Sequence, residues 1–290
     1  MKKLGFIGGG NMAEALARGL LAKRVFEPSD LIASDIDPER RRKLSRELRI
    51  QATANNREVI QEARSIVLAV KPQTIDAVLK ELGEALRAVE AAVPAVGGKL
   101  RGARSATAGA RLFVSIVAGV TIARIERALG ERGRVIRVMP NAPAMVGHGM
   151  AALVRGSKAT NADAALAIRV FKAVGDAVEL DDEGLLDAVT ALSGSGPAYV
   201  YLFVRALTDA AVSEGLPAAL ALRMALQTIH GAEENLRSSS LSPTVLIRIV
   251  ASPGGTTEAA LRRFAEAGFS DIVAAAVHAA AARSRELGRG

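Results

Sequence analysis

The sequence predicts an α/β fold in which a doubly wound, mostly parallel sheet spans residues 1–180 and an all-helical domain spans residues 181–290. Two observations lead to this expectation. In the first part of the chain, short apolar runs typical of strands alternate with runs typical of helices, which is the pattern of a parallel sheet covered by helices. After Asp181 the strand pattern stops, and only helical patterns follow.

The strand and helix predictions follow the apolar runs and the positions of Pro and Gly. The predicted strands are Lys3–Ile7, Asp30–Ser34, Ser65–Val70, Leu112–Ile116 and Arg134–Val138. The predicted helices of the second domain are Glu183–Leu192, Pro197–Glu214, Pro217–Leu236, Pro243–Val250, Glu258–Glu266 and Ser270–Leu287. Pro197 and Pro217 lie where a first-turn proline is tolerated, and Gly215 and Gly268 lie where helices end.

The predicted helix around Ala198–Ala211 is apolar on nearly all of its faces. A helix of this kind is buried on several sides. Because a helical domain of about 110 residues has few fully interior positions, we expect a second subunit to cover this helix. The sequence therefore predicts a homo-oligomer that is at least a homodimer.

Residues 88–111 do not fit the alternating pattern and are predicted to be an unusual insertion. The segment is rich in Ala, Gly, Val and Arg, and it is far longer than the roughly four to six residues of a typical connection. One interpretation is a surface insertion, and the other is a lid or a partner-binding loop.

The composition argues against several classes of function. With no Cys and three widely separated His, the chain has little to ligate a metal, so no metal site is expected. Seven Phe, two Tyr and no Trp provide few base-stacking surfaces, and the basic residues behind the net charge of +8 are dispersed, so no nucleic-acid partner is expected. Dispersed charge is typical of a solvated face, with attraction of an anionic ligand as the alternative. No stretch approaches the roughly 20 apolar residues of a membrane span, so we expect a cytoplasmic protein and no membrane partner.

The strongest local signal is the run Gly8-Gly9-Gly10-Asn11-Met12-Ala13, which matches the pattern G-x-G-x-x-A between a predicted strand and a helix. Gly8 permits a tight turn, Gly10 lets the backbone approach a pyrophosphate, and Ala13 lets the helix and the strand pack closely. The N-terminus of the helix then faces the phosphates. This pattern predicts a Rossmann-type domain that binds a dinucleotide.

The second predicted strand ends at Ser34-Asp35, where a residue that contacts the adenosine ribose is expected. An acid there normally accepts hydrogen bonds from the ribose hydroxyls and favours NADH. A 2′-phosphate, however, has a possible donor in Ser34 and possible counter-charges in Arg40 and Arg41, so the choice between NADPH and NADH stays open. The structural alternative for Asp35 is the N-cap of the helix that follows Pro38.

Three further clusters directly follow predicted strands, at the edge where an open parallel sheet binds its ligands. They are Ala69-Val70-Lys71-Pro72, Ser115-Ile116-Val117-Ala118-Gly119 and Met139-Pro140-Asn141-Ala142-Pro143. The helical half adds Leu192-Ser193-Gly194-Ser195-Gly196-Pro197-Ala198 and Ala251-Ser252-Pro253-Gly254-Gly255-Thr256-Thr257-Glu258. In the last cluster glycines lead into a helix, so its backbone N–H groups and two Thr hydroxyls suit a carboxylate.

Taken together, these motifs resemble those of the pyrroline-5-carboxylate reductases. The runs GFIGGGNMAEAL, AVKPQ, VSIVAGVTI, RVMPNAPA, ALSGSGPAYVY and SPGGTTEAAL occur in that family's order and spacing. SGSGPAY together with SPGGTT is highly specific to the family, and the resemblance covers nearly the whole chain except residues 88–111. Val117 and Ala142 are small departures, because the family more often has Ala and Thr there.

The resemblance implies a reductase that passes hydride from NADPH or NADH to the imine carbon of 1-pyrroline-5-carboxylate and forms L-proline, the last step of proline biosynthesis. The implied cofactor site contains Gly8, Gly10, Asn11, Met12, Ser34, Asp35, Asn56, Ala69, Val70, Lys71, Pro72, Ala118 and Asn141, with Asn141 near the nicotinamide. The implied substrate site contains Ser193, Ser252, Gly255, Thr256 and Thr257, and Thr257 is the catalytic residue that hydrogen-bonds the ring nitrogen. In this family the helical domain forms an interlocked homodimer, often within a ring of dimers, and the subunits share the active site.

The chemistry of this reaction agrees with the scarcity of His and the absence of Cys. A cyclic imine is basic enough to be protonated, and the iminium accepts hydride without a strong acid, so catalysis rests on orientation. Three other functions compete. A 3-hydroxy acid dehydrogenase uses a helical-domain Lys as its acid, yet no Lys follows Lys172. A nucleic-acid-binding protein needs a stacking surface or a basic stripe, and a cofactor-binding regulator does not require the SPGGTT loop.

Overall fold

The computed structural model of the chain describes residues 1–91 and 110–288. Contacts divide the chain into two compact units, one formed by Met1–Gly194 together with the chain from Ala281 onward, and the other by Ser195–Ala280. Most of the insertion predicted over residues 88–111 lies outside the described residues. The helix before it extends to Ala91, and the strand after it begins at Arg111.

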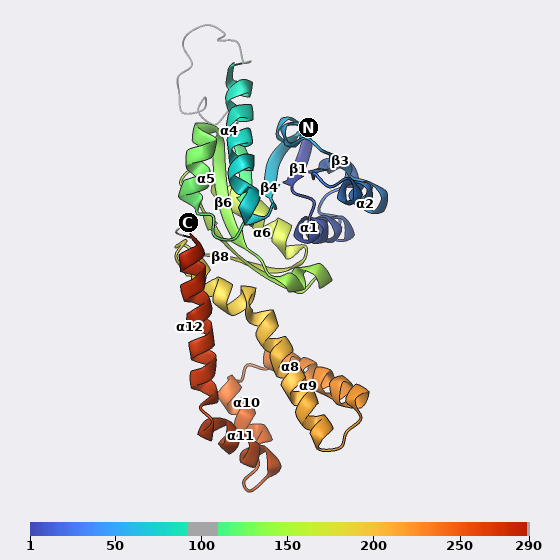
Figure 1. Cartoon of the computed structure of the whole chain (residues 1–290), viewed down its shortest axis with the longest axis vertical. Helices are drawn as coiled ribbons and strands as arrows, with labels where there is room; N and C mark the ends of the chain where they lie inside the picture. The colour runs from blue at the N-terminus through green and yellow to red at the C-terminus, as the bar shows by residue number, and fades with distance from the viewer. Residues whose placement is uncertain (92–109, 289–290) are drawn as a thin grey trace. The chain divides into compact units, whose positions relative to one another are not determined.

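An eight-stranded sheet forms the centre of the first unit (Figure 1). Its strands are β1 (Lys2–Ile7), β2 (Leu31–Ser34), β3 (Gln51–Thr53), β4 (Ala63–Leu68), β5 (Arg111–Ser115), β6 (Gly133–Met139), β7 (Gly149–Arg155) and β8 (Gly175–Glu179). They lie in the order β3-β2-β1-β4-β5-β6-β7-β8, and every neighbouring pair is parallel except β6 and β7. The predicted doubly wound, mostly parallel sheet is confirmed.

Three of these strands, β3, β7 and β8, were absent from the sequence prediction. β3 has only three residues, and the sequence of β8 is GDAVE with one buried residue, so neither contains an apolar run. β7 contains four consecutive buried residues. Periodicity alone cannot distinguish such a short continuous run from part of a buried helix.

Helices cover both faces of the sheet. One core contains residues of α1 (Asn11–Ala22), α2 (Pro38–Leu48) and α6 (Asn161–Lys172). The other contains residues of α3 (Asn56–Glu62), α4 (Ile75–Ala91), α5 (Ile122–Leu129) and α7 (Leu185–Val189). Successive side chains of β5 point to opposite faces of the sheet, so this strand contributes to both cores. Leu112 and Val114 belong to the first core and Phe113 to the second.

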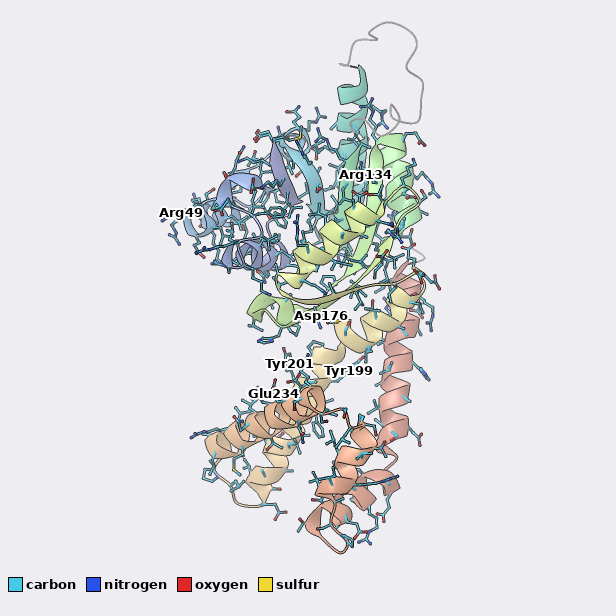
Figure 2. All side chains as sticks on the ribbon, turned by 180° about the vertical axis from the view of Figure 1, so that it is seen from behind. Arg49, Arg134, Asp176, Tyr199, Tyr201 and Glu234 are labelled. Atoms are coloured by element: carbon cyan, nitrogen blue, oxygen red, sulfur yellow. The ribbon has the colours of Figure 1, made fainter. Side chains whose placement is uncertain are left out.

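The N-cap of α2 is Asp37. Its side chain accepts the N–H of Glu39 at 2.8 Å, and Pro38 occupies the first helical position. The structural alternative for Asp35, as the N-cap of this helix, is therefore wrong. The helix ends against Arg49, labelled in Figure 2, which has a left-handed φ of 57°.

An ion pair fixes α6 to the sheet. Arg134 of β6, labelled in Figure 2, donates two hydrogen bonds of 2.8 and 3.0 Å to Asp163. Asp163 also completes a capping box with Thr160 at the start of α6. Burial tends to raise the pKa of the Asp163 carboxyl, but the hydrogen bonds from Arg134 and Thr160 outweigh it and hold the pKa below its ordinary value.

The second unit is built from helices. They are α8 (Gly196–Ser213), α9 (Ala218–Ser238), α10 (Pro243–Val250), α11 (Thr256–Glu266) and the greater part of α12 (Phe269–Gly288). The ring of Phe269 lies 6.5 Å from that of Phe203 and 5.2 Å from that of Phe264, measured between centroids. These rings join the helices within the unit, and the predicted helix bounds agree with the observed ones to within two residues.

The segment predicted as one helix over Glu183–Leu192 is instead α7 followed by a π-helical turn, Thr190–Gly194. Leu186 of α7 is buried in the core of the first unit. Ser284, near the end of α12, donates a 2.6 Å hydrogen bond to Asp187. The contacts therefore place the end of the first unit at Gly194, beyond the predicted boundary at residue 180, because α7 packs on the sheet.

The helix α8 has no buried residue within the single chain. Tyr201 and Leu202 are 65% and 57% exposed, and Figure 2 shows Tyr199 and Tyr201 on this helix. Burial of apolar surface stabilises a protein by about 25 cal/mol for each Å², and apolar surface that stays in contact with water does not contribute this free energy. The helix that the sequence marks as buried on several sides is thus left uncovered by the described residues of this chain.

Candidate cofactor and substrate site

The glycine turn after β1 packs against two neighbouring strands. Gly8 has a φ of +94°, which favours glycine, and its N–H donates to the carbonyl of Ser34 at 2.9 Å. A Cβ at Gly8 would lie 2.7 Å from the carbonyl oxygen of Ala69, closer than atoms pack. Only glycine therefore fits at this position.

The third glycine of the turn faces open space. A Cβ built on Gly10 has no atom within 4 Å. The helix α1 begins at the next residue without a side-chain cap, and its first intrahelical bond runs from the Glu14 N–H to the Gly10 carbonyl. The N–H groups of Asn11, Met12 and Ala13 consequently have no intrahelical acceptor. Free N–H groups, a helix dipole and open space suit a pyrophosphate, which is the ligand that the sequence motif predicts.

Ser34, at the end of β2, faces the interior. It is 1% exposed, and its hydroxyl donates a 2.7 Å hydrogen bond to the side-chain oxygen of Asn56. Asn56 in turn donates to Glu81 at 2.8 Å. The Ser34 hydroxyl, which the sequence offers as one possible donor to a 2′-phosphate, is thus bonded to the first residue of α3 in this structure.

Asp35 lies against the glycine turn. One oxygen of its carboxylate accepts the N–H of Gly9 at 2.7 Å, and the other accepts the N–H of Asp37 at 2.9 Å. Each carboxylate oxygen has two lone pairs, so both keep the capacity to accept a ribose hydroxyl. The carboxylate also brings a negative charge to the carboxyl end of β2, where the ribose is expected.

The two arginines predicted to neutralise a 2′-phosphate are bonded within the protein. Arg40 donates to Glu14 at 3.1 Å and also to the side-chain oxygen of Asn11. Arg41 donates to the carbonyl oxygen of Asp35 at 2.7 Å. Both guanidinium groups therefore already have hydrogen-bond acceptors within the protein.

Glu14 holds this cluster of cations together. It is 8% exposed and forms ion pairs with Arg18, Arg40 and Lys43. Burial tends to raise the pKa of Glu14, but the hydrogen bonds from Lys43 and Arg18 outweigh it and hold the pKa below its ordinary value. Glu14 therefore stays ionised and keeps Arg40 at the start of α1.

The three clusters predicted to follow strands lie beyond the carboxyl ends of β4, β5 and β6, which are mutually parallel. Val70, Lys71 and Pro72 follow β4, and Lys71 is exposed at the start of a short 3₁₀ helix. Ala118 is exposed after β5. The next residue, Gly119, packs against the end of α12, since a Cβ there would lie 3.0 Å from the carbonyl oxygen of Leu287.

Asn141, after β6, is hydrogen-bonded on both sides of its amide. Its oxygen accepts the N–H of Met150 at 2.8 Å, and its nitrogen donates to the carbonyl of Ser193 at 3.0 Å. The hydroxyl of Ser193 donates to the carbonyl of Val189 at 3.0 Å. Asn141 thus connects the sheet edge to the π-helical turn, a contact that no sequence pattern indicated.

The substrate cluster of the second unit begins with a β-turn. The N–H of Gly255 donates to the carbonyl of Ser252 at 3.0 Å, and Gly254 has a φ of +71°. Pro253 in the second position and a glycine with positive φ in the third are what a type II turn requires. A Cβ at Gly255 would lie 2.6 Å from the Ser252 hydroxyl and 3.0 Å from its carbonyl oxygen, so a larger residue there would require the Ser252 side chain to rotate away.

This turn leads directly into α11, whose first two residues are Thr256 and Thr257. The first intrahelical bond runs from the Ala259 N–H to the Gly255 carbonyl, which leaves the N–H groups of Thr256 and Thr257 without an intrahelical acceptor. The N–H of Gly255 is already bonded to Ser252. Of the three residues predicted to bind the carboxylate, only Thr256 and Thr257 therefore have N–H groups that are not bonded within the turn or the helix.

The third residue of α11, Glu258, was not among the predicted site residues. Glu258 accepts the N–H of Gly254 at 2.6 Å. An acid at the third helical position that returns to the turn before the helix has the spacing of half a capping box, which was the available signal in the sequence.

The described ranges contain neither a cluster of metal-ligating side chains nor a helix that could span a membrane. No group of three or more His, Cys, Asp or Glu side chains in residues 1–91 and 110–288 is arranged to hold a metal ion. No helix within this part of the chain is long and apolar enough to cross a membrane.

Two protein families match separate parts of the chain. Residues 3–93 match the family described as NADP oxidoreductase, coenzyme F420-dependent. Residues 183–287 match the family described as pyrroline-5-carboxylate reductase dimerisation. The sheet, the open glycine turn and these matches define a nicotinamide-dinucleotide-dependent oxidoreductase.

Full-length relatives name the family within that class. The chain is 40% identical over 285 residues to the pyrroline-5-carboxylate reductase of Pseudomonas aeruginosa, with 98% of this chain and 96% of the relative covered. It is 35% identical over 288 residues to the enzyme of the same name from Escherichia coli, with 99% of each covered. The chain belongs to the pyrroline-5-carboxylate reductase family.

Solved structures agree. A pyrroline-5-carboxylate reductase from Coxiella burnetii has a TM-score of 0.86 and 31% identity, with 99% of this chain and 98% of that one covered. The pyrroline carboxylate reductase of Plasmodium falciparum, solved with NADP bound, has a TM-score of 0.81 and 30% identity with the same coverage.

Proposed function

We propose that this protein reduces 1-pyrroline-5-carboxylate to L-proline with NADPH or NADH, the last step of proline biosynthesis. The observation that carries the proposal is the presence, in one chain of this family, of two glycine turns that each open a helix. The turn before α1 suits a pyrophosphate, and the turn before α11 suits a carboxylate.

The cofactor supplies a hydride, which moves to the imine carbon while the ring nitrogen gains or retains a proton. The role of this chain is to hold that cofactor. Gly8 permits the tight turn, Gly10 lets the backbone approach the phosphates, and the N–H groups of Asn11 and Met12 bind the pyrophosphate. Asp35 and Asn56 lie at the ribose end, and residues 69–72 with Ala118 line the sheet edge.

The substrate carboxylate binds to the N–H groups of Thr256 and Thr257 at the positive end of α11. The ring nitrogen, which is bonded directly to the ring carbon that bears the carboxylate, then lies within reach of the Thr257 hydroxyl. Thr257 orients the iminium and stabilises the amine as it forms, while the carbonyl of Ser252 closes the turn by accepting the Gly255 N–H. Holding both reactants in near-attack geometry can supply about 7–11 kcal/mol in favourable cases, so no strong acid is required.

The proposal includes a homodimer formed through the helical unit. Its support is the dimerisation family that residues 183–287 match and the uncovered apolar side chains of α8. Assembly of such dimers into a ring and a cytoplasmic location belong to the same proposal.

Loss of absorbance at the reduced nicotinamide band tests the reaction directly. The purified protein is mixed with 1-pyrroline-5-carboxylate, once with NADPH and once with NADH, and the product is identified as L-proline. Oxidation that requires the imine supports the proposal. Absence of imine-dependent oxidation with both cofactors, in protein that is folded, would contradict it.

A further inference from the structure

The first turn of α11 contains a carboxylate that the proposed reaction does not use. Glu258 accepts the N–H of Gly254 at 2.6 Å. In the type II turn Ser252–Gly255, Pro253 has no N–H and the N–H of Gly255 is bonded to Ser252. Among Pro253, Gly254 and Gly255, only the N–H of Gly254 then needs an acceptor, and Glu258 provides it.

This hydrogen bond fixes the orientation of one peptide group. Type I and type II turns differ mainly by rotation of the central peptide, which here joins Pro253 to Gly254. Gly254 has the positive φ of +71° that type II requires. Rotation of this peptide would move the Gly254 N–H away from Glu258, so the carboxylate stabilises the type II form.

The same carboxylate lies in the first turn of the helix that receives the substrate. Glu258 is the third residue of α11, directly after Thr256 and Thr257. A negative charge there is favourable for the helix, because it interacts with the positive end of the dipole. For a carboxylate ligand at that end, however, the charge of Glu258 is a competitor.

We propose that Glu258 is a positioning residue that also sets the affinity for the substrate carboxylate. This inference rests on the proposed function. The hydrogen bond to Gly254 holds the turn so that the N–H groups of Thr256 and Thr257 remain available to the substrate. The charge of Glu258 opposes the substrate carboxylate and keeps its binding weaker than the turn alone would give.

Three substitutions separate the hydrogen bond from the charge. Glu258→Gln keeps an acceptor oxygen and removes the charge, so KM for 1-pyrroline-5-carboxylate should fall about threefold, on the scale of one screened charge pair, with kcat nearly unchanged. Glu258→Asp keeps the charge on a shorter side chain, and Glu258→Ala removes both features. In these two variants the turn loosens, so KM should rise about five- to tenfold, the scale of one lost hydrogen bond to a charged group. KM for the cofactor should not change in any of them.

Glu266→Gln is the matched control. Glu266 lies at the other end of α11 and pairs with Arg263, so the variant has the same change in net charge without touching the turn. Its kinetic constants should equal those of the unmodified protein. Circular dichroism and light scattering on each variant establish that it is folded and assembled.

The outcomes distinguish this inference from the proposed function. Opposite changes of the substrate KM in Glu258→Gln and Glu258→Asp support the inference, and this pair decides it even if Glu258→Ala does not fold. Unchanged KM in both variants, or a rise in both, overturns it while leaving the reaction intact. An unmodified protein that does not reduce the imine overturns the proposed function itself.

Discussion

The side-chain amide of Asn141 donates a 3.0 Å hydrogen bond to the carbonyl oxygen of Ser193. The bond links the loop after β6 to the π-helical turn Thr190–Gly194. Single π-helical turns are rare and occur frequently at functional sites. Because the oxygen of the same amide accepts the Met150 N–H, Asn141 acts by positioning these backbone segments at the edge where the nicotinamide is proposed to bind.

Replacement of Asn141 should lower both stability and turnover. Asn141→Ala loses two partly buried hydrogen bonds, so the free energy of unfolding should fall by about 1–3 kcal/mol. Asn141→Asp keeps the acceptor for Met150 but loses the donor to Ser193, so it isolates the link to the π-helical turn. Urea denaturation and steady-state kinetics measure the two effects.

Asn161→Asp is the control for that experiment. Asn161 is exposed at the first position of α6, where an acid is tolerated, so stability should change by less than about 0.5 kcal/mol. Equal stability and kcat in Asn141→Asp and the unmodified protein would show that the bond to Ser193 has no role.

Substitution of Gly10 should impair cofactor binding without impairing the fold. A Cβ at Gly10 meets no atom within 4 Å, so Gly10→Val should unfold at nearly the same denaturant concentration as the unmodified protein. Its side chain enters the space proposed for the pyrophosphate, so Kd for NADPH should rise at least about a hundredfold, as expected when backbone contacts to phosphate are blocked.

Gly8→Ala gives the opposite result and serves as the comparison. Its Cβ would lie 2.7 Å from the Ala69 carbonyl, and its φ of +94° is unfavourable for Ala, so stability should fall. Fluorescence titration with NADPH and thermal denaturation separate the two variants. Normal NADPH affinity in folded Gly10→Val would rule out the proposed pyrophosphate site.

The extent to which the sequence predicts this molecule depends on how local each feature is. The strand β4 carries a continuous buried run, and the residues after it reach the ligand edge because parallel strands end on the same side. β3 has too few residues for any pattern, and its place at the sheet edge depends on pairing with β2. The sequence therefore predicts which residues follow a buried strand and reach the ligand edge. It does not predict which short, distant segments pair with each other.

The same distinction applies to the candidate site. The glycine turn and the turn at Ser252–Gly255 were recognisable, because local backbone conformation requires those residue types. The direction of each side chain was not. Ser34 was expected to face a ligand, yet it bonds to Asn56, which is 22 residues away in the chain. Side-chain partners of this kind depend on tertiary packing that no local pattern records.

Asp35 should influence the choice between the two cofactors. Its carboxylate lies at the ribose end of the turn and would repel a 2′-phosphate. Asp35→Ser should therefore raise the ratio of kcat/KM for NADPH to that for NADH, by roughly tenfold on the scale of one removed charge. Asp35→Asn keeps an acceptor for the Gly9 N–H and should shift the ratio in the same direction with less loss of stability. No shift, or a shift toward NADH, would contradict this role.

The uncovered side chains of α8 predict how the protein assembles. At micromolar concentration, light scattering should give a mass of at least a dimer. Leu202 is 57% exposed in the single chain, and a charge at a buried interface position is costly, so Leu202→Glu should shift the protein toward monomer. Ala162→Glu, at an exposed position of α6, is the control and should leave the mass unchanged. A monomeric unmodified protein would contradict both the dimer and the burial of α8.

The two threonines that open α11 should differ in their contribution to catalysis. Both lie before the first intrahelical hydrogen bond of the helix, and Thr257 is the less exposed. If the N–H groups of this turn hold the substrate carboxylate, the Thr257 hydroxyl reaches the ring nitrogen, where charge changes during hydride transfer. Thr257→Ala should therefore lower kcat by roughly one to two orders of magnitude, the scale of a lost positioning or proton-transfer group.

Thr256→Ala is the matched comparison, because it makes the same chemical change in the preceding residue. The variant loses the Thr256 hydroxyl and keeps the backbone N–H of that residue. It should cost less, since the substrate carboxylate uses that N–H rather than the hydroxyl. The Kd for NADPH should stay near normal in both variants, which separates an effect on the imine from an effect on the cofactor. Removal of a group lowers kcat only if its interaction strengthens in the transition state. Full activity in Thr257→Ala, or a larger loss in Thr256→Ala, would therefore mean that the Thr256 hydroxyl contacts the ring nitrogen.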